Sequence, residues 1–269
     1  MAMSVMRDTS IRRDIVAYSR DDVVLPRSKG KLLGIDEAGR GPIIGPMVVA
    51  GVLVDSSTVP ILEKLGVRDS KELTPAQRRE LFARILDLAS YVVIVKIPPA
   101  VIDTVNLNRL EISTIAHIVR RTSTIYRDLD AVYIDAVGPA SKMASEVRRL
   151  SGFQGTIVAK PKADRRYLPV SAASIVAKVV RDEEIEKLRQ LYGIRGSGYP
   201  TDPHTLEWIR EAYRESPHSP PWFVRRSWST LKRVAPGWYR AKSTEASNKS
   251  GKSRQKSLLD YLAGRSRDS

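Results

Sequence analysis

The chain has 269 residues, 42% of them hydrophobic, a formal net charge of +15 and no cysteine. This length and apolar content suffice for one packed globular domain with appendages. Because cysteine is absent and only three histidines are present, disulfides, thiolate chemistry and an imidazole zinc site are excluded or disfavoured, so any metal would bind to oxygen. The positive charge is typical of proteins that bind a polyanion, and we favour nucleic acid over an acidic membrane surface.

The N-terminal segment, residues 1–29, is predicted to be an extension that is partly helical around Ile11 to Tyr18. It has no continuous apolar stretch of signal-peptide length, and nowhere in the chain do enough apolar residues run together to span a membrane. We therefore expect a cytoplasmic protein.

Three strands are predicted at the start of the core. Leu32 to Asp36 and Met47 to Asp55 are apolar, β-branched runs separated by a Gly/Pro turn, which predicts an antiparallel hairpin. "YVVIVKI", residues 91–97, predicts a third strand. Between the second and third strands we expect a helix, because Thr74 and Gln77 can form a capping box ahead of an apolar residue pattern of helical spacing.

Two strand–helix units follow in the second half of the core. A helix is predicted within residues 106–127, then a short buried strand that ends at Asp135, a strand at 155–160 and a long helix at 170–192. Small residues near the start of the long helix would allow close packing against its neighbour. Residues 30–192 are therefore predicted to form an α/β domain, a mixed five-stranded sheet flanked by helices.

The rest of the chain divides into three predicted segments. Residues 193–239 should form a helical C-terminal extension. Residues 240–254 are rich in Ser, Lys and Arg without apolar periodicity, which predicts a disordered basic linker. Residues 255–262 contain a small apolar cluster, "QKSLLDYL".

Four acidic residues lie at or near the predicted strand ends: Asp36, Glu37, Asp135 and Asp164. Strand ends of α/β sheets are where sites assemble, but carboxylates about 4 Å apart would repel by about 4 kcal/mol per pair. Divalent cations would reverse this repulsion, and oxygen-only ligands favour Mg²⁺ or Mn²⁺. Two such ions can catalyse phosphodiester hydrolysis. Any one of these acids alone would more often be structural.

Several long motifs, in order and at comparable spacing, resemble archaeal-type ribonuclease HII from Lys31 to about Arg233: "GIDEAGRGPIIGPMVVAGV", "DSKELTPAQRR", "YIDA", "KADRRYLPVSAASIVAKVVRD" and "GSGYPTDP". The resemblance implies a ribonuclease H-like fold and hydrolysis of the RNA strand of RNA/DNA hybrids. It also implies cutting on the 5′ side of single ribonucleotides in duplex DNA, leaving 3′-hydroxyl and 5′-phosphate ends. The corresponding roles would be ribonucleotide excision repair and RNA primer removal by a monomeric enzyme.

The same resemblance assigns roles to individual residues. The four acids would bind the metals and be catalytic. The backbone of Gly39, Arg40 and Gly41 would read the ribose 2′-hydroxyl, which distinguishes RNA from DNA, and Tyr199 would stack at the junction. Residues that could hold phosphates, or merely form a solvated basic face, are Lys71, Lys160, Lys162, Arg165 and Arg166. For Ser171 and Ser174 we favour a packing role over orientation of the site.

The C-terminal "QKSLLDYL" resembles the peptide that binds the DNA sliding clamp. Gln255, Leu258, Tyr261 and Leu262 would occupy its key positions, with Leu262 in place of the usual second aromatic residue. A helical turn would place the three apolar side chains together for insertion into a groove. The alternative is that this segment folds back on its own domain.

Two other functions fit parts of the sequence. A nuclease or strand transferase of the same fold would act on DNA junctions, but Gly39 to Gly41 and Tyr199 argue for ribose recognition. A catalytically silent hybrid-binding protein recruited by the clamp would lack or displace at least one acid, and all four are present.

Overall fold

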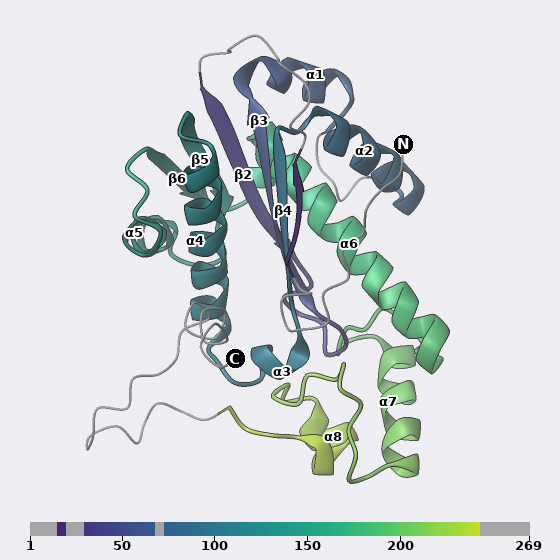
Figure 1. Ribbon diagram of the computed structural model, residues 1–269. Coiled ribbons are helices and arrows are strands. Elements are labelled where there is room, and N and C mark those ends of the chain that lie inside the picture. Colours follow the sequence, from purple (N-terminus) through teal and green to yellow (C-terminus); the bar gives the residue numbers. More distant parts are fainter. Residues whose placement is uncertain (1–14, 20–29, 68–72, 243–269) are drawn as a thin grey trace, which may run out of the picture.

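The computed structural model describes residues 15–19, 30–67 and 73–242, with only the backbone given for 15–19 (Figure 1). A single mixed sheet forms its centre, in the order β1-β4-β3-β2-β5-β6. The strands are β1 (Ile15–Ser19), β2 (Lys31–Ala38), β3 (Met47–Asp55), β4 (Tyr91–Ile97), β5 (Leu129–Asp135) and β6 (Thr156–Lys160). The β1, β4, β3 and β2 strands pair antiparallel, whereas β2–β5 and β5–β6 pair parallel.

The predicted mixed sheet of five strands is confirmed as β2 to β6, and β1 adds a further strand at its edge. The expectation of a helix around Ile11 to Tyr18 is wrong where the chain is described, because Ile15–Ser19 pairs with β4. A strand edge exposes unpaired backbone groups, and the β-branched start of "IVAYS" suits pairing there better than a helix.

Helices cover both faces of the sheet. The described helices are α1 (Val59–Lys64), α2 (Pro75–Leu88), α3 (Pro99–Ile102), α4 (Leu107–Ile125), α5 (Ala140–Ser151), α6 (Leu168–Tyr192), α7 (Pro203–Glu215) and α8 (Leu231–Val234), with 3-10 turns η2 (Ser56–Thr58), η3 (Ala163–Arg165) and η4 (Pro236–Trp238). In Figure 1, α4 and α5 lie on one side of the sheet and α2 and α6 on the other. The capping box predicted for α2 is present, since Gln77 and Thr74 bond reciprocally.

Three apolar clusters hold these layers together. One lies between the sheet and α4 and α5, and a second between the sheet and α1, α2 and α6. The third joins α7, α8 and the end of α6 to the loop after β2, and it is centred on the fully buried Trp238 and Phe223. This third cluster ties residues 193–239, which we call the C-terminal extension, to the end of the sheet where β2 stops.

The start of α6 packs directly on β2, as its small residues predicted. At Gly34, a Cβ atom would lie 2.0 Å from the carbonyl carbon of Pro169, so only glycine fits there. Ser171 and Ser174 are buried at this contact. The contact matters for the site, because it brings α6 beside Asp36, two residues further along β2.

Among the residues that the structure describes, no helix is both long enough and apolar enough to span a membrane. Lys71, the linker beyond residue 242 and the clamp-like peptide at 255–262 lie outside the described residues.

Candidate active site

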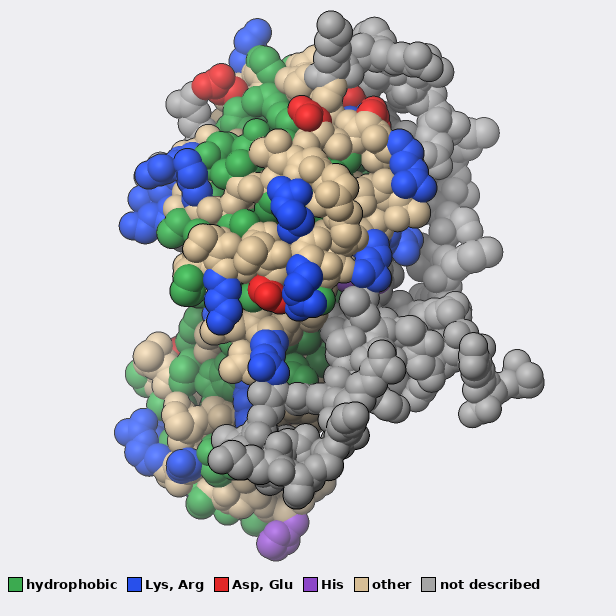
Figure 2. All heavy atoms as spheres, turned by 90° about the vertical axis from the view of Figure 1, so that its left-hand side faces the viewer, with side chains coloured by type: hydrophobic (Ala, Val, Ile, Leu, Met, Phe, Trp, Pro, Cys, Tyr) green, Lys and Arg blue, Asp and Glu red, His purple; other side chains and the backbone are tan. Residues whose placement is uncertain are grey.

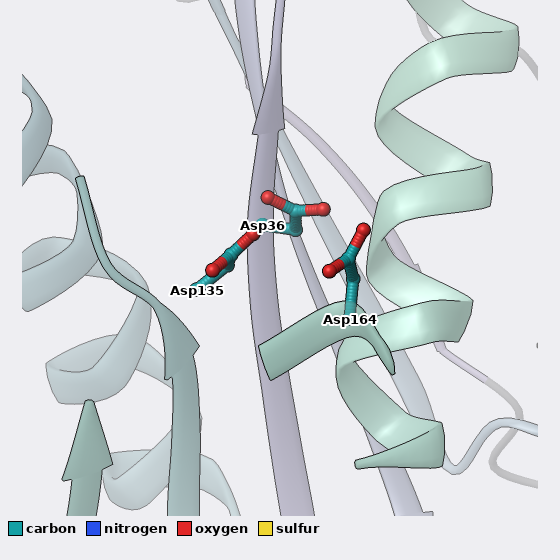
Figure 3. A group of neighbouring side chains, drawn as sticks. All are labelled: Asp36, Asp135 and Asp164. Carbon is teal, nitrogen blue, oxygen red and sulfur yellow. The ribbon is translucent and has the colours of Figure 1, made fainter. Parts of the chain in front are cut away.

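Three aspartates from separate segments meet at one end of the sheet (Figure 3). Asp36 comes from β2, Asp135 is the last residue of β5, and Asp164 lies in η3 just after β6. One carboxylate oxygen from each can be chosen so that all lie within 4.8 Å of one another. Asp36 and Asp164 are buried, and Asp135 is partly exposed.

Strand register explains why Asp36 and Asp135 are neighbours. The parallel pairing of β2 with β5 ends at Ile35 opposite Ile134, and the next residue on each strand is the aspartate. The strand is predicted to end at Asp36, but neither Asp36 nor Glu37 is its last residue. Both belong to β2, which runs on to Ala38 because its other edge still pairs with β3.

Hydrogen bonds hold the carboxylates of Asp135 and Asp36 and the backbone of the segment that carries Asp164. The Asp135 carboxylate accepts a hydrogen bond from the Ala163 amide, 3.1 Å away, which ties β5 to the turn carrying Asp164. The Ser174 side chain hydrogen-bonds to the Asp36 carboxylate, and the Ser171 hydroxyl donates to the main-chain carbonyl of Asp164. The packing role expected for the two serines is therefore incomplete, since each also contacts an acid segment.

Glu37 lies beside this cluster but is not part of it. It follows Asp36 on β2 and is among the residues that line a cleft. Its charge still interacts with those of Asp135 and Asp164. The structure thus brings together three of the four predicted acids closely, with the fourth at the rim.

The acids are crowded enough to resist ionisation without a counter-charge. Burial, followed by the charges of Glu37 and Asp135, raises the pKa of Asp36 well above its ordinary value. Burial and the Asp135 charge raise the pKa of Glu37 from 4.5 to about 7, although Arg40 opposes this. A set of buried oxygen ligands that repel one another in this way fits a divalent cation.

A cleft of about 460 Å³ opens beside the acids, bordered by Glu37 to Gly41 on one side and by Arg78, Arg181 and Tyr199 on the other. Tyr199 is 40% exposed, and its ring lies against Gly41, where a Cβ atom would be 3.4 Å from the ring. Gly39 has a φ of +81°, and a Cβ atom there would lie 2.8 Å from the Pro46 carbonyl oxygen. The loop after β2 therefore requires glycine at position 39.

The Arg40 side chain turns away from the three aspartates. Its guanidinium forms an ion pair with Glu111 and a hydrogen bond to Asn108, both on α4. Glu111 is 1% exposed, so its negative charge is compensated by Arg40 within the protein. Nothing in the residue pattern around Glu111 marked it as a partner of this loop, because the contact joins segments 71 residues apart in the sequence.

Basic side chains surround the site. Lys160, Lys162, Arg165 and Arg166 are exposed on the segment that carries Asp164. Arg78 and Arg181 in the cleft were not among the predicted phosphate-binding residues, because helix positions give no sign of a shared cleft. Figure 2 shows the face that carries α5, where Lys and Arg side chains are prominent and acidic ones are few.

The chain matches the family model described as Ribonuclease HII over residues 33–231. It is 58% identical over 233 residues to Ribonuclease HII of Hyperthermus butylicus, an alignment that covers 86% of this chain and 95% of that one. It is also similar to the crystal structure of ribonuclease H2 from Pyrococcus horikoshii, with a TM-score of 0.71, 39% identity and coverage of 77% and 98%. The PCNA:RNase HII complex from Archaeoglobus fulgidus gives a TM-score of 0.67, 36% identity and coverage of 76% and 96%.

Proposed function

Because the chain belongs to the ribonuclease HII family, and is therefore a type II ribonuclease H acting on RNA/DNA hybrids, we propose that it also cuts on the 5′ side of single ribonucleotides in duplex DNA. The products would carry 3′-hydroxyl and 5′-phosphate ends, as required in ribonucleotide excision repair and RNA primer removal. We call residues 39–46, between β2 and β3, the glycine loop. The observation that carries the proposal is that Asp36, Asp135 and Asp164 meet beside the cleft that this loop and Tyr199 border.

The family is dependent on divalent metal ions, and the residues present suit Mg²⁺ or Mn²⁺. Asp36, Asp135 and Asp164 would hold the ions, with Glu37 contributing from the rim of the cleft. Two bound ions would supply an activated water and stabilise the leaving oxygen. The protein keeps the carboxylates oriented through Ser174 and the Ala163 amide.

Substrate selection would depend on the loop and on Tyr199. Since the Arg40 side chain is held by Glu111, ribose recognition falls to the backbone groups of Gly39, Arg40 and Gly41. The exposed Tyr199 ring next to Gly41 is placed to stack on the sugar or base at the junction. Lys71 and the exposed cations around Asp164 would hold phosphates of the substrate.

The experiment that tests this activity offers the protein an end-labelled DNA duplex with one internal ribonucleotide, together with Mg²⁺ or Mn²⁺. We expect a single cut on the 5′ side of the ribonucleotide, with a ligatable 5′-phosphate on the downstream product. The same duplex made entirely of DNA is the control. No cleavage, or equal cleavage of the control, would contradict the proposal.

A monomeric enzyme that binds the DNA sliding clamp is a separate part of the proposal. The similar protein from Archaeoglobus fulgidus was solved in a complex with PCNA. Here, Gln255, Leu258, Tyr261 and Leu262 would form the clamp-binding peptide. Truncation after Tyr239 should abolish clamp pull-down and leave cleavage of naked duplex unchanged, and a truncated chain that still binds the clamp would refute the assignment.

A further inference from the structure

The glycine loop after β2 is held from behind by one buried side chain. Arg225, in the C-terminal extension, is 0% exposed. Its guanidinium donates to the carbonyls of Gly39 at 2.6 Å, Arg40 at 3.0 Å and Gly45 at 2.9 Å. Trp228 stacks on that guanidinium, 4.9 Å from its ring centroid, and its indole nitrogen donates to the Gly41 carbonyl at 3.0 Å.

Burying this charge is costly, and the groups that compensate it belong mostly to the loop. Burial, together with the nearby Arg181 charge, lowers the pKa of Arg225 to about 9, and the Asp103 charge opposes this only in part. The Asp103 carboxylate is itself bonded to the Arg226 amide and to Ser227. Arg225 is thus compensated mainly by loop carbonyls, an arrangement that depends on the loop keeping one conformation.

Because these carbonyls are held in place, the directions of the N–H groups in the same peptides are also fixed. In a trans peptide the C=O and the following N–H point in opposite directions. The Gly39 carbonyl shares its peptide with the Arg40 amide, and the Arg40 carbonyl shares its peptide with the Gly41 amide. With both carbonyls turned to Arg225, the two amides point away from it, and the same three residues, Gly39 to Gly41, border the cleft.

The hydrogen bonding of these two amides differs from that of the amides further along the loop. In the part of the chain that the structure describes, neither donates a backbone hydrogen bond outside the regular strands and helices. A cation bound at the carbonyl end of a peptide polarises it and makes its N–H a stronger donor. By contrast, the next amides along the loop are taken, since Ile43 and Ile44 both donate to the Gly198 carbonyl.

We propose that Arg225 is the positioning residue that aims the Arg40 and Gly41 amides at the ribose 2′-hydroxyl, so that the C-terminal extension sets the preference for RNA over DNA at the cut site. This rests on the proposed function, in which the loop reads the ribose. The hydrogen bonds of the Arg225 guanidinium go to carbonyls of the loop, and Arg225 acts through the loop.

The test measures ribose preference separately from chemistry. In an Asp135→Asn background, which is expected to bind without cutting, the dissociation constants for a duplex with one ribonucleotide and for the all-DNA duplex are compared by fluorescence anisotropy in Mg²⁺. Arg225→Met should reduce the preference by about tenfold while affinity for all-DNA duplex changes little. Arg225→Lys, which keeps the charge but loses the planar fork, should give an intermediate preference.

Two further variants keep the test decisive. Arg226→Met is the matched control, because the neighbouring guanidinium donates to the Trp238 carbonyl and not to the loop, so its preference should equal that of the parent. If Arg225→Met proves unfolded by circular dichroism, Trp228→Phe removes one loop contact, keeps a ring over Arg225 and should lower the preference partially.

The outcomes separate the positioning role of Arg225 from the proposed recognition of the ribose by the loop. The parent protein is the Asp135→Asn variant. If it binds the duplex with one ribonucleotide more tightly than the all-DNA duplex, and a folded Arg225→Met variant shows the same preference, the role of Arg225 alone is overturned. If Arg225→Met does not fold, an unchanged preference in both Arg225→Lys and Trp228→Phe would overturn it too. A parent protein that binds both duplexes equally would show that the loop does not read the ribose, and the inference would fall with the proposed function.

Discussion

Replacing Glu37 by Gln should stabilise the metal-free protein near neutral pH. Burial and the Asp135 charge raise the Glu37 pKa from 4.5 to about 7, so the folded protein holds this proton more tightly than the unfolded chain does. The resulting stability is fully present below pH 4.5 and is lost as the pH rises through about 7. Glutamine cannot ionise, so the free energy of unfolding of Glu37→Gln should not show this part of the decline as the pH rises.

The size of the effect follows from the shift. One pKa unit corresponds to about 1.36 kcal/mol, so a rise from 4.5 to about 7 corresponds to about 3 kcal/mol in the free energy of unfolding. Solvent contact at the rim of the cleft reduces this to about 2 to 3 kcal/mol. Removing the Glu37 charge also relieves repulsion on Asp36, whose pKa it helps to raise, so the benefit has the same sign at both residues.

The assay is denaturant unfolding followed by circular dichroism in EDTA, at a series of pH values across this range. Between the acidic and the neutral end of the pH series, the free energy of unfolding of the wild-type protein should fall by about 2 to 3 kcal/mol more than that of Glu37→Gln. Glu146→Gln, at a surface position on α5 where Arg149 lowers the pKa of the carboxyl, is the control and should keep the wild-type decline. Adding Mg²⁺ or Mn²⁺ in place of EDTA should reduce the difference in stability between Glu37→Gln and the wild-type protein at neutral pH, since bound cations stabilise the ionised site.

Parallel pH curves for wild type and Glu37→Gln would refute the reasoning. They would mean that the Glu37 carboxyl is solvated well enough to ionise as it does in the unfolded chain. The argument that acid crowding prepares the site for a cation would then lose its support at this residue.

Three further variants test other parts of the site. Asp135→Asn should abolish cleavage while changing duplex affinity only a few-fold, and residual turnover near the wild-type rate would exclude Asp135 from the reaction. Glu111→Ala leaves the partly buried Arg40 without its ion-pair partner and should lower the free energy of unfolding by about 3 kcal/mol, as measured in urea; an unchanged midpoint would mean that Arg40 re-solvates freely. Tyr199→Ala should reduce kcat/KM on the single-ribonucleotide duplex by about tenfold, whereas Tyr199→Phe should keep most of it; equal loss in both would point to the hydroxyl instead of the ring.

Local sequence determined much of the secondary structure. The β3 and β4 strands begin and end where their apolar runs do, and α2 begins at the capping box of Thr74 and Gln77. These features depend on contacts between residues close in the chain, which composition and spacing reveal. The long motifs also pointed to the ribonuclease HII family before any geometry was known.

Where strands pair at a distance, the sequence was a poorer guide. The edge strand Ile15–Ser19 lies where the sequence predicts a helix around Ile11 to Tyr18, and β2 runs on to Ala38, past its predicted end at Asp36. In both cases the outcome depends on a partner strand elsewhere in the chain. Local preferences are too small to decide against the backbone hydrogen bonds that such a partner offers.

The sequence alone therefore pointed to the acids through their positions at predicted strand ends, and to the glycine loop and Tyr199 through the resemblance of their motifs to the family. Only the tertiary structure decided how they are arranged. The β2–β5 register places Asp36 beside Asp135, α4 takes up the Arg40 side chain, and Arg225 reaches the Gly39 carbonyl across 186 positions of the chain. A buried arginine among apolar residues has no periodic signal in a sequence, since what stabilises it is a set of backbone carbonyls that any residue could supply.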